Sequence, residues 1–418
     1  MSKRILSLDG GGTWALVQVE ALIALYGEGT SGRAVLRDFD LVVANSGGAL
    51  VVGALFEDFT LEQVRKLFHD THMLARLFKP KSFARWRAKI DVLPRYVTRT
   101  KLAMLEEFLP VGAATKLADI PAELDGTDIL LLAFDYDGER SVYLRSEPTS
   151  PSQSRLGDFP YQAARELSLT DAIHGSSTPP VRYFDDPATT TSQRTRRLWD
   201  GGLGGYNNPV LAGLCELLSD RSVAPQDLQV LSLGTGQVRR LPHRSAELLR
   251  ARNPDVEIPA AAIIPGGDPL AAHVLARTMH DLETLATVIL DDPPDAASYV
   301  AFLMMGHKPP LAGSELDELR LVRMNPVLTP IRDGQRWTLP SRFADPGEFA
   351  QLAALELDAH AERDIDLISR FARAWIHAKQ ASELPNQGIR QHWDNSLDFG
   401  DSTFAAAKRR WQGLINRA

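Results

Sequence analysis

A serine at the apex of a glycine-rich turn is the first candidate for chemistry in this sequence of 418 residues. Ser46 lies in the stretch Ala44-Asn45-Ser46-Gly47-Gly48. A β-branched apolar run before it predicts a buried strand over 39–43, and an apolar run after it predicts a helix over 49–56. Such a turn, a nucleophile elbow, projects a hydroxyl and aims the N–H groups of a helix N-terminus at developing negative charge. Ser46 is therefore the leading candidate for a nucleophile.

Two more loops of small residues follow predicted strands. The stretch 9–12 (Asp-Gly-Gly-Gly) follows a strand predicted over 3–8, and the stretch 200–202 (Asp-Gly-Gly) follows an apolar pair. Loops at the carboxyl ends of parallel strands line the ligand crevice of an α/β sheet, so we expect the three loops to meet. Ser46 would then attack an acyl carbonyl, and Asp200 would accept its proton. The expected oxyanion donors are the N–H groups of Gly10, Gly11 and Gly12, and the glycines expected to support the site are Gly47, Gly48, Gly201 and Gly202.

These three loops, in this order, resemble the patatin-like phospholipase family as it occurs in bacteria. Members of that family carry an Asp-Gly-Gly-Gly loop, a Gly-x-Ser-x-Gly elbow and an Asp-Gly-Gly or Asp-Gly-Ala loop, and they use a Ser–Asp dyad without histidine. The resemblance covers residues 3–240. Further similarities are Ser176-Ser177-Thr178-Pro179, Asn207-Asn208-Pro209, the stretch 232–236 and, more loosely, Arg323-Met324-Asn325-Pro326.

The resemblance implies a three-layer α/β/α sandwich with a mostly parallel central sheet and a helix-rich C-terminal portion. We therefore expect a catalytic core over residues 1–240 and a mostly helical extension over 241–418 that packs on it. In the extension, Asp345-Pro346 is a helix start, and we expect one helical region from there to about Ser382. Further helices are expected over 163–173, 269–290 and 404–415.

The activity implied by the resemblance is release of fatty acids from phospholipids or related acyl esters at a membrane, with neither a metal nor a cofactor. Some bacterial relatives are antiphage effectors that a cyclic nucleotide activates to degrade the membrane of the cell. The resemblance therefore adds an antiphage role and a cyclic nucleotide activator to the expectations for this chain.

Three departures from the family pattern bear on the site. Ala44 stands where the elbow usually has its first glycine. Trp14 stands where an arginine usually follows the glycine loop, so a buttress of the oxyanion loop is expected to be missing. The loop over 200–209 is one residue longer than usual, and the extra residue falls after the aspartate.

A basic segment over 76–101 interleaves aromatic residues, among them Phe83 and Trp86. One interpretation is a solvated surface with some side chains packed inward. The functional alternative is a flap that contacts a membrane transiently, by apolar insertion of Phe83 and Trp86 and by attraction to anionic head groups. A formal net charge of −7 for the whole chain argues against a nucleic-acid partner.

The remaining bulk features favour a cytoplasmic protein with peripheral membrane contact. Cys215 is the only cysteine, so no intramolecular disulfide is expected. The first residues lead directly into a predicted strand without a signal-peptide apolar region, and no apolar stretch is long enough to span a bilayer.

Two other functions fit parts of the sequence. A lipid-binding pseudoenzyme would explain the missing arginine but leaves Ser46 and Asp200 without a role. A sugar kinase of the actin-like ATPase fold would use 9–13 and 234–236 as phosphate loops, but it needs a β-hairpin where a helix is predicted after Thr13. His174 lies near the expected site, and a helix-end or core position is the simpler interpretation of it.

Overall fold

The central sheet of the protein is mixed, and most of its strands run parallel. The computed structural model describes residues 2–81, 94–146, 166–190, 196–264, 294–309, 319–391 and 394–417. Within them, the strands of this sheet are β1 (Lys3–Leu8), β2 (Leu41–Ala44), β3 (Asp128–Asp135), β4 (Arg140–Arg145), β5 (Ala188–Thr189), β6 (Arg197–Asp200), β7 (Leu228–Leu233) and β9 (Leu321–Met324).

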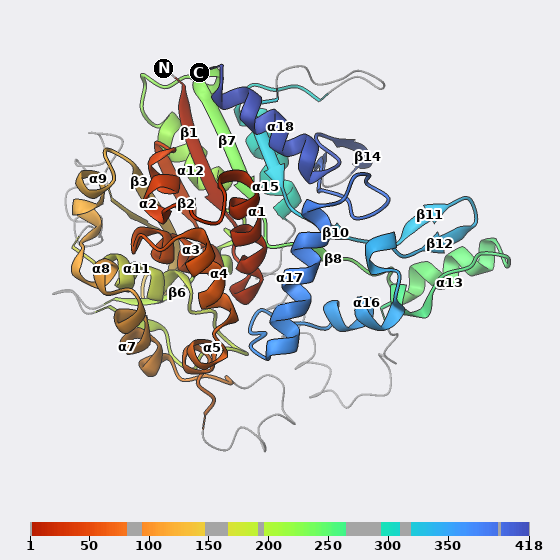
Figure 1. Cartoon of the computed structure of the whole chain (residues 1–418), viewed down its shortest axis with the longest axis horizontal. Coiled ribbons are helices and arrows are strands. Elements are labelled where there is room, and N and C mark those ends of the chain that lie inside the picture. Colours follow the sequence, from red (N-terminus) through yellow and green to blue (C-terminus); the bar gives the residue numbers. More distant parts are fainter. Residues whose placement is uncertain are drawn as a thin grey trace.

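The strand order is β5-β6-β3-β2-β1-β7-β9, and β4 pairs with β3 (Figure 1). The run from β3 through β9 is parallel, whereas β4 and β6 are antiparallel to β3. Three two-stranded sheets complete the described strands: β8 (Gln237–Val238) with β10 (Val327–Leu328), β11 (Ile331–Asp333) with β12 (Arg336–Thr338), and β13 (Ile389–Gln391) with β14 (Asp394–Phe399).

Alternate side chains of the parallel strands enter two different apolar cores. In β2, Val42 belongs to one core, whereas Leu41 and Val43 belong to the other. In β1, Leu6 and Ile5 divide in the same way. This alternation follows from the two-residue period of a strand, and it requires helices on both faces of the sheet.

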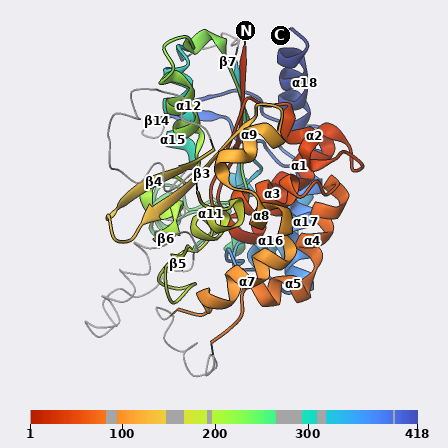
Figure 2. The same cartoon turned by 90° about the vertical axis from the view of Figure 1, so that its left-hand side faces the viewer.

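Helices cover both faces, as Figure 2 shows. One face carries α12 (Val210–Leu218) and α15 (Pro294–Met304), and the other carries α1 (Leu16–Tyr26), α3 (Gly47–Phe56), α4 (Leu61–His69) and α17 (Glu362–Ile376). The other α-helices are α2 (Gly32–Arg37), α5 (Thr71–Leu77), α7 (Thr98–Phe108), α8 (Pro110–Ala114), α9 (Ile120–Glu123), α11 (Leu169–Ser176), α13 (His243–Arg252), α16 (Pro346–Leu352) and α18 (Phe404–Ile415). The expected three-layer α/β/α sandwich is confirmed.

The segment after the first glycine loop is helical. A short 3₁₀ turn over Gly12–Ala15 leads directly into α1. The kinase alternative needs a β-hairpin at this place, so the structure contradicts it.

Residues beyond 240 share the central sheet with the residues before it. Strand β9 pairs in parallel with β7, and α17 packs against α1. The ring of Phe371 on α17 meets the ring of Trp14 edge-on, with the centroids 6.0 Å apart. The division into two parts at residue 240 stays a prediction, but β9 belongs to the sheet of the first part.

The helical region predicted from 346 to about 382 is wrong in its middle. Helix α16 ends at Leu352 and α17 begins at Glu362. Between them, the carbonyl of Leu357 accepts hydrogen bonds from the N–H of Thr13, at 2.9 Å, and from its hydroxyl, at 3.1 Å. A carbonyl engaged in this way is not available to a helix, so a tertiary contact overrides the local helical preference.

The other expected helices fare differently. The terminal helix over 404–415 is confirmed as α18. The helix expected over 163–173 begins in the described residues only at Leu169, where the Ser168 hydroxyl caps it. The helix expected over 269–290 lies outside the described residues, as do Phe83 and Trp86. In the described parts of the chain, no helix combines the length and the apolar character that a membrane crossing needs.

Candidate active site

One edge of β3 brings Ser46 and Asp200 together. Strand β4 occupies the other edge of β3, so β2 and the antiparallel β6 must share this one. Ala44 at the end of β2 is opposite Leu131, and Asp200 at the end of β6 is opposite Ala133. Two positions along a strand span about 7 Å. The two strands therefore end facing each other, and the loops that leave them must meet.

Ser46 has a backbone conformation that side chains rarely adopt. Its φ is 50° and its ψ is −117°. Such a conformation costs a non-glycine residue of the order of 1–3 kcal/mol and persists only where the surroundings impose it. The N–H of Ser46 donates to the carbonyl of Ser176 at 3.2 Å, and the carbonyl of Asn45 accepts from Gly48 at 2.8 Å. The turn is the strained elbow that the sequence predicts.

Three of the predicted supporting glycines lie where a side chain has no room. A Cβ atom on Gly47 would come within 2.8 Å of the nitrogen of Gly12. On Gly48 it would lie 2.5 Å from the carbonyl oxygen of Leu8, and on Gly201 it would lie 2.5 Å from Oδ1 of Asn45. The first two loops are therefore packed backbone against backbone, and the third packs against the side chain of Asn45. Gly202, the fourth, donates its N–H to Asp200 Oδ1 at 2.8 Å.

Asp200 is buried, with 2% of its surface exposed. Burial raises the pKa of its carboxyl group. Hydrogen bonds from the Ser46 hydroxyl, the Gly202 N–H and the Asn45 side chain oppose that rise, as does the positive charge of Lys101. The carboxylate accepts from Asn45 Nδ2 at 3.1 Å. The serine hydroxyl thus has a carboxylate partner whose affinity for a proton is greater than usual.

The glycine loop presents fewer free N–H groups than the sequence predicts. The N–H of Gly10 donates to the carbonyl of Asn207 at 2.8 Å, so it is already engaged. Among the described residues, the N–H groups of Gly11 and Gly12 donate to no other protein group. Gly12 has a φ of 56°, in the left-handed region that favours glycine. Gly11 and Gly12 are the candidates left for binding an oxyanion.

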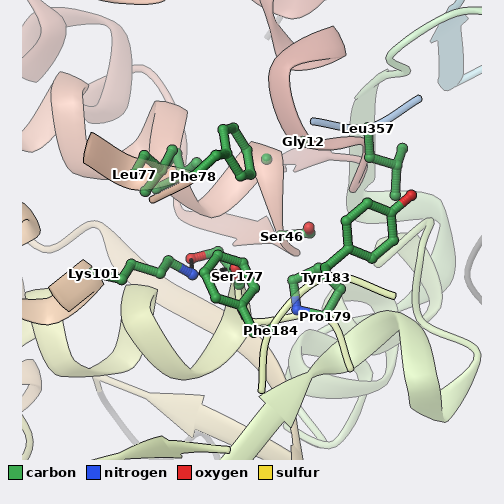
Figure 3. Close-up of a pocket in the computed structure, with 12 residues that line it drawn as sticks. Gly12, Ser46, Leu77, Phe78, Lys101, Ser177, Pro179, Tyr183, Phe184 and Leu357 are labelled. Carbon is green, nitrogen blue, oxygen red and sulfur yellow. Dashed lines mark hydrogen bonds between the residues drawn. The ribbon is translucent and has the colours of Figure 1, made fainter. Parts of the chain in front are cut away.

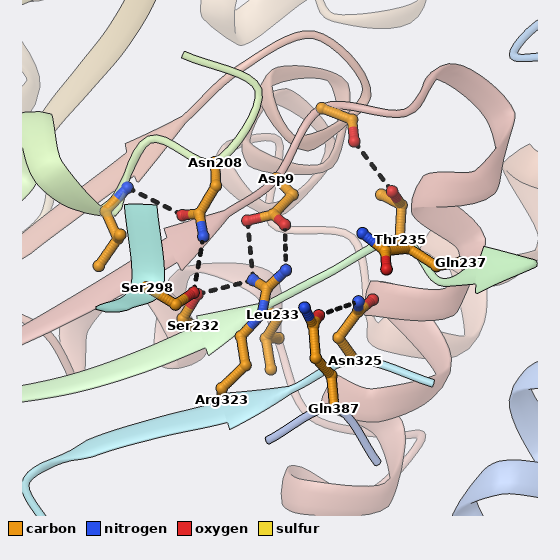
Figure 4. A network of polar contacts seen from close by, with 12 residues as sticks. Asp9, Asn208, Ser232, Leu233, Thr235, Gln237, Ser298, Arg323, Asn325 and Gln387 are labelled. Atoms are coloured by element: carbon orange, nitrogen blue, oxygen red, sulfur yellow. Dashed lines mark hydrogen bonds and ion pairs between the residues drawn. The ribbon is translucent and has the colours of Figure 1, made fainter. Parts of the chain in front are cut away.

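The loop also rests on a buried ion pair that involves a residue far along the chain. Arg323 on β9 forms two parallel contacts with Asp9, Nη1 to Oδ1 at 3.0 Å and Nη2 to Oδ2 at 2.6 Å (Figure 4). Nη1 of Arg323 also donates to the hydroxyl of Ser232 at 2.8 Å. A bidentate pair of this kind fixes both side chains in orientation as well as in position. It holds the start of the glycine loop.

The structure accounts for each of the three departures from the family pattern. Trp14, at the position of the expected arginine, is buried, and its ring nitrogen donates to the carbonyl of Glu356 at 3.3 Å. The arginine that supports the loop is Arg323 instead. Ala44 ends β2 without a positive φ. The longer loop after Asp200 continues to an exposed left-handed turn at Gly205, which leaves the aspartate in place.

Ser46 faces a pocket of about 360 Å³ (Figure 3). Its lining residues are Gly12, Ser46, Gly47, Leu50, Leu77, Phe78, Lys101, Ser177, Pro179, Tyr183, Phe184 and Leu357. A second pocket of about 560 Å³, lined almost wholly by apolar side chains, shares Gly12, Leu50, Leu77 and Phe78 with the first. We call the second one the apolar pocket. The shared residues make the two spaces neighbours.

His174 takes no part in a triad. It is a buried residue of α11, with 2% of its surface exposed. Burial lowers its pKa well below the usual range, and the positive charge of Lys101 adds to that shift. The imidazole is therefore neutral, which agrees with the core position expected from the sequence. In the described residues, no group of three metal-ligating side chains comes together.

Sequence reasoning missed three residues of the site. Lys101 stood in the basic segment as one cation among many. Arg323 was part of a loose similarity to the family, and nothing local connects it with Asp9. Leu357 was placed inside a predicted helix, although its carbonyl covers Gly12 and Thr13. Each acts on residues far away in the sequence. The strand β9 is the only signal for Arg323, and the break in the helical region before α17 is the only signal for Leu357.

A strained serine turn beside a glycine loop, at the carboxyl edge of a mostly parallel sheet, defines an α/β protein built around a nucleophile elbow. The sequence model described as patatin-like phospholipase matches residues 6–214. The chain belongs to this family.

The curated relatives agree with that assignment without adding detail. The 85/88 kDa calcium-independent phospholipase A2 of rat is 27% identical over 276 residues, which cover 60% of this chain and 29% of the relative. The mouse protein gives the same values. The chain thus spans less than a third of these curated relatives.

Two solved structures are similar to this one at low sequence identity. VipD from Legionella pneumophila is 9% identical, with a TM-score of 0.35 over 99% of this chain and 75% of that protein. Human GIVD cytosolic phospholipase A2 is 13% identical, with a TM-score of 0.31 over 89% of this chain and 58% of that protein.

The ion pair between Asp9 and Arg323 generates the first prediction. Replacing Arg323→Met leaves the Asp9 charge buried without its partner, and we expect it to lower the free energy of unfolding by about 3–5 kcal/mol. Adding Asp9→Asn removes that charge, so the double variant should be more stable than the sum of the single changes predicts. Urea unfolding measures all three, with Arg332→Met on the exposed β11 turn as the control. Strictly additive losses would contradict the pairing.

The strain at Ser46 generates the second. Ser46→Gly should unfold at higher urea concentration than Ser46→Ala, with a difference of about 1 kcal/mol, because glycine adopts this φ without strain. Both variants lack the hydroxyl, so the comparison isolates the backbone. The same pair of substitutions at Ser222, an exposed residue without a positive φ, is the control and should reverse the order. Equal stability of the two Ser46 variants would mean an unstrained turn.

Proposed function

We propose that this protein is a serine acyl hydrolase that cleaves fatty acyl esters of membrane lipids, with Ser46 as nucleophile and Asp200 as base. The observation that carries the proposal is the strained Ser46 beside the buried carboxylate of Asp200, next to the N–H groups of Gly11 and Gly12, which donate to no other described protein group. Family membership supports the reaction class. The lipid substrate is supported by the names of the relatives, which are phospholipases A2.

The reaction proceeds in two halves that each return Asp200 to its ionised form. Ser46 Oγ attacks the ester carbonyl while Asp200 takes its proton, and the N–H groups of Gly11 and Gly12 bind the oxyanion. The intermediate collapses to an acyl-serine, and the departing alcohol takes the proton from Asp200. Water then attacks the acyl-serine, again giving its proton to Asp200, and the fatty acid leaves as Ser46 regains that proton.

The raised pKa of Asp200 suits this role. An aspartate at its usual pKa is a weak base toward a hydroxyl, and burial improves the match between the two groups. The backbone hydrogen bonds that hold Ser46 and Asp200 to the 176–178 segment reduce the need to find the correct geometry at each turnover. A donor aimed at an oxyanion is worth about 3–4 kcal/mol of barrier, so the two glycines supply much of the remaining catalysis.

The apolar pocket gives the acyl chain a place to bind. Its walls come from α3, α4, α5 and α7, and include Leu67, Phe68, Met104, Leu105 and Phe108. Transfer of each methylene from water to such a pocket is favourable by about 0.8 kcal/mol. A polar ester would gain nothing from these walls, so the pocket favours a fatty acyl substrate.

Several finer features of this function rest on the family resemblance alone. They are the cyclic nucleotide activator, the antiphage role, and the cytoplasmic location with peripheral membrane contact. Membrane contact through Phe83 and Trp86 is a further proposal, supported by the basic and aromatic character of their segment. A lipid-binding pseudoenzyme is the outcome that absence of turnover would establish.

The third prediction tests the nucleophile. A fluorophosphonate should label the wild type on Ser46, as located by mass spectrometry, and should not label Ser46→Ala. Ser46→Ala and Asp200→Asn should each lower kcat for a p-nitrophenyl ester by at least about 10³-fold. The exposed Ser222→Ala variant should retain labelling and turnover. An adduct on a different serine, or turnover that survives Ser46→Ala, would refute the assignment.

The fourth prediction tests the apolar pocket. Ala54→Leu adds three carbons to a wall residue on α3 and should lower kcat/KM for long acyl chains more than for a butyryl ester. Leu105→Ala removes bulk on the facing α7 and should move the preference toward longer chains. Kinetics with a series of p-nitrophenyl esters measures both shifts. Equal effects on all chain lengths would place the acyl chain elsewhere.

A further inference from the structure

Lys101 is a buried lysine beside the nucleophile. It lies on α7 with 1% of its surface exposed, and it lines the pocket into which Ser46 faces. Figure 3 shows its amine directed at Ser177, on the side of Ser46 away from Tyr183 and Leu357. Lysine is almost never fully buried unless its charge is paired, so this placement requires an explanation.

Three oxygen atoms accept hydrogen bonds from the amine of Lys101. They are the carbonyl of Ser177, its hydroxyl at 2.9 Å, and the hydroxyl of Thr178 at 3.0 Å. Both hydroxyls give their own protons to carbonyls of α11, that of Ser177 to Ile173 and that of Thr178 to His174. All three oxygens therefore need a proton from Lys101. An ammonium group has three and a neutral amine has two, so this site is built for the charged form.

The segment that Lys101 holds contacts both members of the proposed dyad. The carbonyl of Ser176 accepts the N–H of Ser46 at 3.2 Å. The carbonyl of Thr178, two residues later, accepts the N–H of Asp200 at 3.0 Å. Lys101 binds Ser177, which lies between them, and the hydroxyl of Thr178 itself. Movement of this short segment would therefore change the distance from Ser46 to Asp200.

The charge of Lys101 also acts on Asp200. Burial lowers the pKa of Lys101 to about 7, and the negative charge of Asp200 opposes that shift. In return, Lys101 opposes the rise that burial imposes on the pKa of Asp200. The Phe184 ring, with its centroid 4.7 Å from Nζ, adds a cation–π contact.

Other titratable groups around Lys101 leave this pairing intact. His174 on α11 is neutral, because burial lowers its pKa. Asp185 faces the start of α7, where it accepts the N–H of Thr98 at 2.9 Å and pairs with Lys81 at 3.0 Å. Asp200 on β6 is the charge that couples to Lys101.

We propose that Lys101 is a positioning residue of this site: its ammonium group holds the 176–178 segment against both residues of the proposed dyad and places a buried positive charge in the pocket that Ser46 faces. The inference rests on the proposed function, because it assigns Lys101 to the Ser46–Asp200 reaction. During attack the negative charge moves from Asp200 to the substrate oxygen. The positive charge of the ammonium group offsets this negative charge both before and after it moves.

The fifth prediction concerns Lys101→Met, which keeps the length of the side chain and removes its charge. Without the cation, the acid limb of kcat/KM for a butyryl ester should move to higher pH, because the pKa of Asp200 rises. The wild type should also lose activity above about pH 7 as Lys101 gives up its proton, and the variant should lack that alkaline limb. Arg99→Met removes an exposed cation from the same helix and should leave the profile unchanged.

Two further measurements separate this inference from packing and from the proposed function. The ¹³Cγ signal of Asp200, assigned with Asp200→Asn, should titrate at a higher pH in Lys101→Met than in the wild type. This readout needs no turnover, so it decides the role of Lys101 even if the wild type hydrolyses no ester. In that case the proposed function fails, and the titration of Asp200 still tests the inference about Lys101.

A second variant guards against a fold defect. In Lys101→Ala, propylammonium should restore turnover and the wild-type titration of Asp200, whereas 1-propanol of the same size should not. Rescue by both compounds, or unchanged pH midpoints in Lys101→Met, would mean that the side chain only fills space and would overturn the proposal.

Discussion

The site depends on one edge of β3 that two strands share. Strand β2 approaches along it in parallel and β6 approaches in the opposite direction, so their last residues face each other across a short gap. The other features of the site act where the ends of these two strands meet. The glycines allow the loops to touch, the 176–178 segment joins the backbones of Ser46 and Asp200, and the strain at Ser46 results from closing the turn in so little room.

Two acidic side chains are buried at this junction, and each has a buried cation. Asp9 has Arg323 in a direct ion pair, and Asp200 has Lys101 at longer range. Buried ion pairs seldom add stability over apolar residues of the same size, because desolvation cancels most of the attraction. What they supply here is orientation. Arg323 fixes the first residue of the glycine loop, and Lys101 acts on the charge and the position of the dyad.

The three loops could be predicted because each has a local pattern of small residues after a strand. Parallel-sheet geometry brings together the loops after β1 and β2, whereas the third loop joins them because the antiparallel β6 shares an edge of β3 with β2. The partners of the loops could not be predicted in this way. Whether the N–H of Gly10 is free depends on Asn207, and whether residues 353–361 are helical depends on hydrogen bonds from Thr13 and Trp14. Lys101 is similar to its basic neighbours in the sequence. Only the fold shows that this cation is buried.

The carbonyl of Leu357 against Gly12 has a consequence for the order of synthesis. Ser46 and Asp200 leave the ribosome well before β9 and the segment that precedes α17. At about 5–20 residues per second, the nascent chain has Ser46 and Asp200 for several seconds before Arg323 and Leu357 emerge. Until then Asp9 lacks its counter-ion and the glycine loop lacks its cover. The glycine loop therefore reaches its supported form only after residues 323–357 have been made.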